Sequence, residues 1–454
     1  MNCIIQTCRS FYVGLRLSWM QRLVLSISLF VVSQHPSQLL HHIGFHIATS
    51  YLITWLLYLF NAQKNNRKRW NVLGVQLPYV PIDPFKVSLI TFAFYEMLGD
   101  YLVGAYIPIG IKLLHESRLR RELKRIGSDG MYGKYGFTTK YNAFWLISMA
   151  DVLIRIDISY GGRNHVTLDV YANVYNGAKH KLDLKQYDKG FPVIVFVYGG
   201  GWCSGDKNLY APLARTLNRL GYIVVVPNYS LWPIGSMDDM VHDVGCAIKW
   251  TFKHIESYGG NVDRVSVMAH SAGAHLSVLA MIRNAEKLSF SNSVKNEDSC
   301  DALSRVYSMI MISGPYDISD HLVFESSRGI DEVSCMARLL DNDYNKFHQA
   351  SPSQIDHLFT TTQLKLILKW LPTNWLIIHG QYDAVVPFTS SMKLYNALKN
   401  VGVDHIFLKT YTHIGHAKII FDLMLPKQEV ELEDELNWFF GMCASVEAFK
   451  TRHE

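Results

Sequence analysis

From about residue 154 onward, short apolar runs alternate with stretches that have helical character. The first two runs, RIDISYGG and HVTLDVYANV, alternate apolar and polar residues around a Gly-Gly turn, which is typical of a hairpin. The later runs are continuously apolar, as in strands buried on both faces. These runs are 192–198, 222–229, 264–269, 307–313 and 373–380, and helical segments at 211–221, 237–255 and 389–402 lie between them. The pattern predicts an α/β fold with a mostly parallel sheet covered by helices.

The first third of the chain has long apolar runs instead, at 23–33, 43–60 and 87–111. A helix that spans a bilayer needs about 20 mostly apolar residues, and the second run with its flanking residues best meets that length. The first run is short enough for a signal peptide, but no cleavage-site pattern follows it, so we favour an uncleaved anchor. We expect residues 1–145 to form a membrane-anchoring region with one to three membrane helices, and residues 150–445 to form one α/β domain.

Charge divides the chain at the same place. Residues 1–130 hold 14 Lys/Arg and 6 Asp/Glu, whereas the remainder holds 30 and 33, so the net charge of +5 describes neither part. Basic clusters at 64–69 and 118–125 flank the apolar runs, and short loops rich in Lys and Arg tend to stay on the cytosolic side. We therefore expect a membrane protein, of the endoplasmic reticulum or Golgi, whose α/β domain faces the cytosol.

Composition and motifs exclude several classes of protein. With 49% hydrophobic and 18% charged residues, the chain is too apolar to be disordered. The 7 cysteines are scattered without a CxxC pair, which argues against a disulfide scaffold and a structural zinc module. There is no P-loop and no GxGxxG fingerprint. We expect no metal, no cofactor and no nucleic-acid partner.

Candidate chemistry follows the strand 264–269, where the chain reads Ala269-His270-Ser271-Ala272-Gly273 before a buried helical stretch. A serine at the tip of a sharp strand-to-helix turn has its hydroxyl exposed above the sheet, and small neighbours let strand and helix approach. The pattern favours a nucleophilic serine. An ordinary serine in a helix-capping turn is the alternative.

The strand 192–198 ends in Tyr198-Gly199-Gly200-Gly201-Trp202. Three consecutive glycines allow the backbone to turn its N–H groups toward one point, which suits the binding of an oxyanion. A permissive loop after a strand is the alternative.

An acid and a base follow the serine in chain order. Asp383 comes after the strand 373–380, and His413 and His416 come about 30 residues later. A serine hydroxyl needs a neutral imidazole to take its proton, and a carboxylate orients that imidazole. His416 is preceded by glycine and followed by a helix start, so we favour it as the base, with His413 as the alternative.

These motifs resemble the α/β-hydrolases of the esterase/lipase group, over about residues 150–440. The stretches 232–280, 312–322 and 351–353 and the sequence HGQYDAVVP are similar to the prenylcysteine α-carboxyl methylesterases in particular. The chain departs from the family pattern at three places, which are Ala269, Tyr198 in place of histidine, and THIGHA around the base. The resemblance implies an α/β-hydrolase fold behind a membrane-associated helical region. It also implies roles for Ser271 as nucleophile, Asp383 as acid, His416 as base, and Gly200, Gly201 and Ala272 as oxyanion N–H donors.

The implied activity is that of a serine carboxylic ester hydrolase that acts on a lipophilic ester through an acyl-enzyme. The substrate is then a small lipophilic ester or a prenylated peptide, with a prenylcysteine methyl ester as one candidate. A lipase or a sterol or acyl deacetylase is the alternative, and a non-catalytic ligand-binding homologue is the second. Residues 320–372, which include TTTQLKLILKWLP, suggest a lid or cap, and the polar segment 286–305 predicts a surface loop.

Overall fold

The computed structural model describes residues 51–52, 69–72, 75–78, 152–173, 189–290, 302–331, 334–424 and 438–440. The chain divides into two compact units, Met1–Val103 with Glu325–Val333, and Gly104–Phe324 with Ser334–Glu454. In the first unit, β1 (Arg69–Val72) pairs with β2 (Val75–Pro78) in an antiparallel hairpin.

The predicted membrane segments at 23–33, 43–60 and 87–111 lie outside the described residues, apart from Tyr51 and Leu52. Within the part of the chain that the structure describes, no helix combines the length and the apolarity that a bilayer crossing requires. The anchoring region at 1–145 and its boundary with the domain at 150–445 therefore stay predictions.

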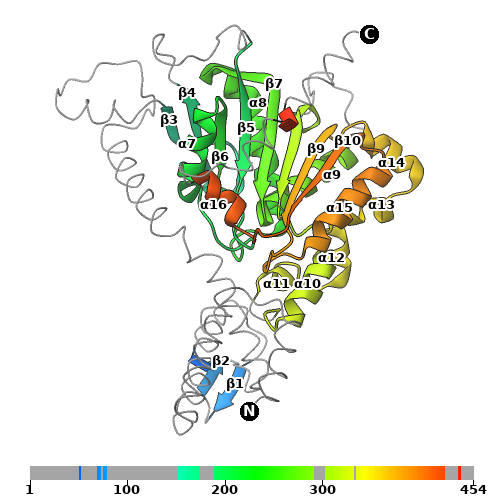
Figure 1. The fold of residues 1–454 in the computed structure, drawn as a ribbon. Helices are drawn as coiled ribbons and strands as arrows, with labels where there is room; N and C mark the ends of the chain where they lie inside the picture. Colours follow the sequence, from blue (N-terminus) through cyan, green and yellow to red (C-terminus); the bar gives the residue numbers. More distant parts are fainter. Residues whose placement is uncertain are drawn as a thin grey trace, which may run out of the picture. The chain divides into compact units, whose positions relative to one another are not determined.

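The second unit contains a sheet of eight strands in the order β10-β9-β8-β7-β5-β6-β4-β3 (Figure 1). All neighbouring pairs are parallel except β3 with β4 and β4 with β6. The strands are β3 (Val152–Ser159), β4 (Thr167–Asn173), β5 (Phe191–Val197), β6 (Ile223–Pro227), β7 (Gly260–His270), β8 (Ser308–Ile312), β9 (Asn374–Gly380) and β10 (His405–Tyr411). The leading hairpin and the mostly parallel sheet predicted from the sequence are confirmed.

Helices connect the strands. The longer ones are α7 (Ala211–Arg219), α8 (Met237–His254), α9 (Ala272–Phe290), α10 (Ile318–Ser327), α14 (Thr361–Leu368), α15 (Phe388–Val401) and α16 (Lys418–Met424). The shorter ones are η2 (Arg163–His165), η4 (Lys207–Tyr210), η5 (Ile255–Tyr258), η6 (Ala302–Arg305), α11 (Met336–Leu339), α12 (Tyr344–Gln349), η7 (Pro352–Gln354) and α13 (Ile355–Leu358). α7 packs against α16 and α8 against α9, as part of the helical cover of the sheet in Figure 1.

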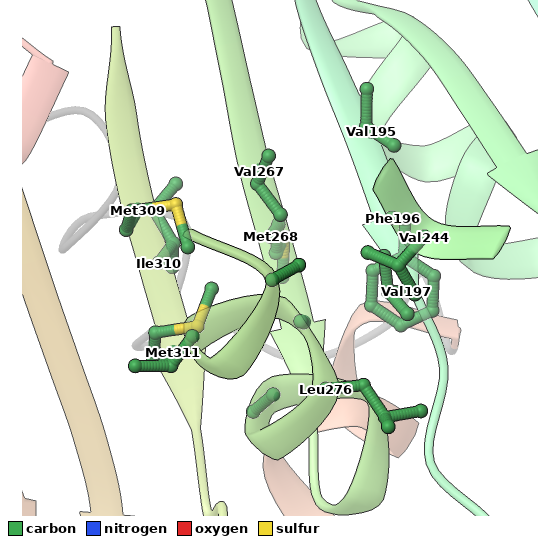
Figure 2. Close-up of a cluster of buried hydrophobic side chains, with 14 of the residues drawn as sticks. Val195, Phe196, Val197, Val244, Val267, Met268, Leu276, Met309, Ile310 and Met311 are labelled. Atoms are coloured by element: carbon green, nitrogen blue, oxygen red, sulfur yellow. The ribbon is translucent and has the colours of Figure 1, made fainter. Parts of the chain in front are cut away.

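Three strands of the sheet are mostly apolar and are buried along their whole length, as their sequences predict. Every residue of β6, β8 and β9 is buried, and since successive side chains of a strand point to opposite faces, both faces of the sheet are covered. Figure 2 shows this core, with Val267 and Met268 of β7 beside strand β8, and with Val244 of α8 and Leu276 of α9 among the clustered side chains.

One local prediction is wrong at both ends of the segment. Residues 286–305 were expected to form a surface loop, but α9 continues to Phe290 and η6 begins at Ala302, while residues 291–301 lie outside the described residues. The last turns of α9 contain Ala285, Glu286 and Lys287, which are good helix formers, so helix propensity outweighs the polar character of this stretch.

Candidate active site

Ser271 lies between the end of β7 and the start of α9, in a sharp turn at the carboxyl edge of the sheet. Its φ of 53° is in the left-handed region, which is uncommon for a residue with a side chain. The turn is held by the N–H of Ser271, which donates to the carbonyl of Ile312 (2.8 Å), and by the N–H of His275, which donates to the carbonyl of Ser271 (3.1 Å). The strained turn is thus fixed from the neighbouring strand and from the first turn of the helix.

The small residue two positions after the serine has a clear physical reason. A Cβ at Gly273 would lie 2.3 Å from the carbonyl oxygen of Tyr198 and 2.4 Å from that of Val197. Only glycine permits this approach between the first turn of α9 and the end of β5. The close packing brings the glycine loop next to the serine, since a Cβ at Gly199 would lie 2.6 Å from Cβ of Ser271.

The structure brings Ser271, His416 and Asp383 into one hydrogen-bonded chain. Nε2 of His416 lies 2.9 Å from Oγ of Ser271, and Nδ1 of His416 lies 2.7 Å from Oδ2 of Asp383. All three residues are buried. They come from the ends of β7, β9 and β10, which are parallel strands and therefore end at the same edge of the sheet.

His413, the alternative base, is exposed, and its ring lies against that of Tyr382 with the centroids 5.8 Å apart. His416 instead lies in the segment that connects β10 to α16, shortly before the helix begins at Lys418. A Cβ at Gly380 would lie 2.0 Å from the carbonyl oxygen of Ile414, so the end of β9 and this segment are in backbone contact. This backbone contact fixes the position of the segment that carries His416 relative to the end of β9.

The carboxylate of Asp383 is fully enclosed and strongly hydrogen-bonded. Oδ1 accepts from the N–H groups of Val385 and Val386, both at 2.8 Å, and Oδ2 faces His416 and His379. Burial alone would raise the pKa of Asp383. Attraction to His416 and the hydrogen bonds of His379 and His416 outweigh burial and hold that pKa well below its usual range. The site therefore keeps a carboxylate anion beside the imidazole.

The peptide groups of the glycine loop have defined directions. Gly200 O accepts from the N–H groups of Cys203 (3.2 Å) and Ser204 (3.0 Å) and from the Ser204 hydroxyl (2.7 Å), while Gly199 O accepts from the Tyr210 hydroxyl (3.4 Å). In a trans peptide unit the C=O and the following N–H point in opposite directions. The N–H groups of Gly200 and Gly201 therefore point away from these donors.

Ala272, the third expected oxyanion donor, is the first residue of α9. An N–H in the first turn of a helix has no intrahelical acceptor, and the helix dipole favours negative charge there. Gly200, Gly201 and Ala272 thus all lie in the two segments that enclose Ser271, the glycine loop and the start of α9.

Asn228, which the sequence analysis missed, supports the glycine loop. Its Oδ1 accepts from the Tyr198 hydroxyl (2.8 Å) and from the Lys207 N–H (2.7 Å), and its Nδ2 donates to Oδ2 of Asp206 (2.9 Å). Asp206 also caps η4 by accepting from the N–H of Asn208. The tyrosine that stands in place of the family's histidine is thus tied to the end of β6.

Three buried histidines near the site were also missed. Nε2 of His270 lies 2.9 Å from the carbonyl oxygen of His416, and burial first, then His416, lowers the pKa of His270 to about 3. His379 contacts Asp383, and His275 bonds the side chain of Trp202. The signal was present in the sequence, since each histidine adjoins a motif residue within an otherwise apolar stretch.

The other polar residues near the motifs have structural partners. Asp239 forms a capping box with Ser236 at the start of α8. The carboxylate of buried Asp243 accepts from the N–H of Arg163 (2.6 Å) and from the hydroxyl of Ser230 (2.6 Å). Cys203 packs against the core. Among the described residues, no group of three or more His, Cys, Asp or Glu side chains is arranged to hold a metal ion.

The strand order, the serine turn and the mostly parallel sheet with its helices define an α/β-hydrolase fold. Residues 182–398 match the protein-family model described as BD-FAE. The resemblance to α/β-hydrolase esterases inferred from the sequence is confirmed.

Curated relatives carry esterase names. The chain is 28% identical over 249 residues to a probable isoprenylcysteine alpha-carbonyl methylesterase of Arabidopsis thaliana, covering 55% of this chain and 48% of that protein. It is 28% identical over 241 residues to esterase LipC of Mycobacterium tuberculosis, covering 52% and 54%. The chain thus spans about half the length of these two relatives. Among solved structures, an esterase of Pyrobaculum calidifontis is 19% identical with a TM-score of 0.47, covering 76% of this chain and 98% of that one.

Proposed function

We propose that this chain is a serine carboxylic ester hydrolase. The observation that carries the proposal is the hydrogen-bonded chain from Oγ of Ser271 through His416 (2.9 Å) to Asp383 (2.7 Å). An imidazole in contact with both a serine hydroxyl and a buried carboxylate is the arrangement that activates a serine nucleophile. The esterase names of the curated relatives support the same class of reaction.

The mechanism runs through an acyl-enzyme. Nε2 of His416 takes the hydroxyl proton of Ser271 while Oγ bonds to the carbonyl carbon of the ester, and the negative charge that develops on the carbonyl oxygen is stabilised by backbone N–H groups. The tetrahedral intermediate collapses, its C–O bond to the alcohol breaks, and the alcohol leaves with the proton from His416. Water then attacks the acyl group, gives a proton to His416, and the carboxylic acid leaves as Ser271 regains its proton.

In this proposal Ser271 is the nucleophile, His416 the general base and acid, and Asp383 the carboxylate that fixes the imidazole tautomer. The oxyanion donors are the N–H groups of Gly200, Gly201 and Ala272. The directions of the loop peptides, with the carbonyls of Gly199 and Gly200 bonded elsewhere, support the first two. The position of Ala272 at the first turn of α9 supports the third.

The proposed substrate is a lipophilic ester, with a prenylcysteine methyl ester as the leading candidate. Hydrolysis of such an ester releases methanol and a free carboxylate. The name of the Arabidopsis relative supports this choice, and so does the apolar, basic first third of the chain, which suits attachment to a membrane. We also propose that residues 320–372 act as a cap over the site, and that the protein resides on a membrane of the endoplasmic reticulum or Golgi with this domain in the cytosol.

A fluorophosphonate probe tests the central claim, because it forms a covalent adduct only with an activated serine. The wild-type protein is expected to be labelled at Ser271, the Ser271→Ala variant is expected to lose labelling, and Ser257→Ala, at an exposed serine in η5, is expected to keep it. Equal labelling of Ser271→Ala and wild type contradicts the proposal, as does the absence of labelling in folded wild-type protein.

The substrate is tested separately with full-length protein. S-farnesylcysteine methyl ester, a triacylglycerol, a sterol acetate and short p-nitrophenyl esters are compared by kcat/KM, each with Ser271→Ala as the blank. Preference for the farnesylcysteine ester supports a methylesterase. Preference for the triacylglycerol or the sterol acetate would contradict the prenylcysteine ester as substrate. The proposal that the chain is a serine ester hydrolase would still stand.

A further inference from the structure

Trp202, directly after the three glycines, has an unusual backbone conformation and a buried side chain. Its φ is 60°, in the left-handed region that side-chain-bearing residues rarely adopt, and only 3% of its surface is exposed. Its carbonyl accepts from the N–H of Trp232 (2.9 Å). A strained backbone of this kind persists only where surrounding contacts hold it.

The side chain of Trp202 donates a hydrogen bond to His275 of α9, and its ring also meets that of His321 edge to face (centroids 6.4 Å apart). The indole Nε1 lies 3.2 Å from Nδ1 of His275, and the two rings meet edge to face with their centroids 5.4 Å apart. Nε2 of His275 lies 2.7 Å from the carbonyl oxygen of Ala350. The chain Trp202–His275–Ala350 therefore links the glycine loop, the helix that follows the serine, and the end of α12.

This chain of bonds determines the tautomer of His275. The indole nitrogen is only a donor and a carbonyl oxygen is only an acceptor, so Nδ1 accepts from Trp202 and Nε2 carries the proton that goes to Ala350. Burial, and to a lesser degree Arg283 and His321, lower the pKa of His275 to about 4, although its bond to Ala350 opposes this. The ring is thus neutral at neutral pH, and Nδ1 remains available as an acceptor.

We propose that His275 is a positioning residue for the oxyanion loop, which it holds through the indole N–H of Trp202. This inference rests on the proposed function, since it concerns the loop that supplies the N–H groups of Gly200 and Gly201. Those N–H groups stabilise charge only if they stand ready in the correct direction before the reaction begins. Trp202 is joined directly to Gly201, so a displacement of the Trp202 backbone after the loss of this bond also shifts the adjoining residue Gly201 and its N–H.

Two substitutions separate the two bonds of His275. In the His275→Asn variant, the side-chain amide oxygen lies close to the position of Nδ1 in the wild type. It can accept a hydrogen bond from Trp202, but the hydrogen bond to Ala350 is lost. In the His275→Gln variant, the side-chain amide nitrogen lies close to the position of Nε2 in the wild type. It can donate to the carbonyl of Ala350, but no acceptor faces the indole N–H of Trp202. Trp202→Phe removes the same bond from the other side and retains an aromatic ring.

The expected result is a selective loss of kcat. His275→Gln and Trp202→Phe are each expected to lower kcat by about 10- to 100-fold, somewhat less than the removal of an oxyanion donor, with KM changed by less than about threefold. His275→Asn is expected to retain most of kcat. The double variant Trp202→Phe/His275→Gln is expected to be no slower than the slower single variant, because both remove one bond. Equal losses in His275→Asn and His275→Gln overturn the inference, as does full kcat in Trp202→Phe.

A second measurement does not depend on activity. Hydrogen–deuterium exchange of the peptide that contains residues 199–204 is expected to be faster in His275→Gln and Trp202→Phe than in wild type and His275→Asn. Unchanged exchange in both variants contradicts the positioning role. If folded wild-type protein hydrolyses no ester and yet the exchange pattern is as expected, the proposed function fails and the positioning of the loop stands.

Discussion

Nε2 of His379 lies 3.2 Å from Oδ2 of Asp383, the same oxygen that faces Nδ1 of His416. Nε2 of His379 also lies 3.2 Å from the carbonyl oxygen of Val386, so both of its neighbours are acceptors and Nε2 carries a proton, while Nδ1 lies 2.7 Å from the Ser391 hydroxyl. Asp383 therefore has a second imidazole donor that takes no part in the contact with Ser271. This second donor stabilises the anion in a fully buried place, where an isolated carboxylate would be costly.

The depressed pKa of Asp383 predicts a loss of stability in acid. Its pKa is lower in the folded protein than the value of about 3.9 for an unfolded chain, so the unfolded state binds the proton first as the pH falls. The stability due to this carboxylate is present above pH 4 and is lost below it, at up to about 1.4 kcal/mol per pH unit. Urea unfolding of wild type between pH 5 and pH 2.5 measures this slope.

The control for that measurement is Asp404→Asn, at an exposed carboxyl group. Asp383→Asn is expected to be less stable than wild type at pH 7 and to lose stability less steeply below pH 4, whereas Asp404→Asn is expected to follow wild type. An equal acid slope in Asp383→Asn and wild type would show that this carboxylate is not the group responsible.

The two histidines after β10 are expected to differ sharply in their effect on turnover. His416→Ala removes the group that contacts both Ser271 and Asp383, and is expected to lower kcat by about 10⁴-fold or more. His413→Ala alters an exposed ring that contacts Tyr382, and is expected to change kcat by less than about threefold. Steady-state hydrolysis of a p-nitrophenyl ester measures both. Loss of turnover in His413→Ala alone would assign the base to the other histidine.

The fold could be predicted from the sequence because the central strands are continuous apolar runs. The runs at 222–229 and 307–313 became β6 and β8, buried on both faces. The end of α9 could not be predicted in this way, since a polar helix turn and a polar loop have the same composition. The apolar runs before residue 130 lie outside the described residues, and their interpretation stays a prediction.

The supporting residues of the candidate site could not be predicted because their partners are distant in the chain. Ser271 and Asp383 lie in short local motifs that can be recognised in the sequence. Asn228 gains its importance from Tyr198 and Asp206, 30 and 22 residues away, and His275 from Ala350, 75 residues away. Only the assembled sheet brings these side chains to their partners, so even a histidine close to a motif does not reveal its contacts.

Gly380 is expected to be intolerant of any side chain. A Cβ at this position would lie 2.0 Å from the carbonyl oxygen of Ile414, which is backbone and cannot rotate away, so Gly380→Ala must displace the segment that carries His416. The free energy of unfolding is expected to fall by about 1–3 kcal/mol, as for other overpacked sites. The rate of ester hydrolysis is expected to fall as well, because His416 moves relative to Ser271.

The matched control is Gly245→Ala in the middle of α8, where the nearest atom to the new Cβ is a side-chain carbon of Leu303 at 3.9 Å. Alanine is the better helix former, so this variant is expected to be more stable by about 0.5–1 kcal/mol with unchanged turnover. Thermal unfolding and kcat are measured for both variants. A Gly380→Ala protein as stable and as active as wild type would refute the contact.

The role of Asn228 is expected to depend on the hydrogen bonds of its side-chain amide, and not on the size of the side chain. Asn228→Asp replaces Nδ2, the donor to Asp206, by an oxygen, so two carboxylates face each other at a partly buried place beside the glycine loop. The loss of the donor and the repulsion are expected to lower the free energy of unfolding by about 1–3 kcal/mol at pH 7. The rate of ester hydrolysis is expected to fall too, because Tyr198 and the N–H of Lys207 share the same amide.

Asn400→Asp is the matched control, because the side-chain amide of Asn400 also donates to a carboxylate, that of Asp356 (3.0 Å), but on the exposed end of α15. Water and salt screen the repulsion there, so the cost is expected to stay below about 1 kcal/mol, without change in kcat. Urea unfolding at pH 7 and the kcat of each variant measure the difference. Equal destabilisation by the two substitutions would mean that Asn228 contributes no more than a surface hydrogen bond, and the support of the loop would then have to come from the stacked rings of Tyr198, Tyr210 and Tyr229.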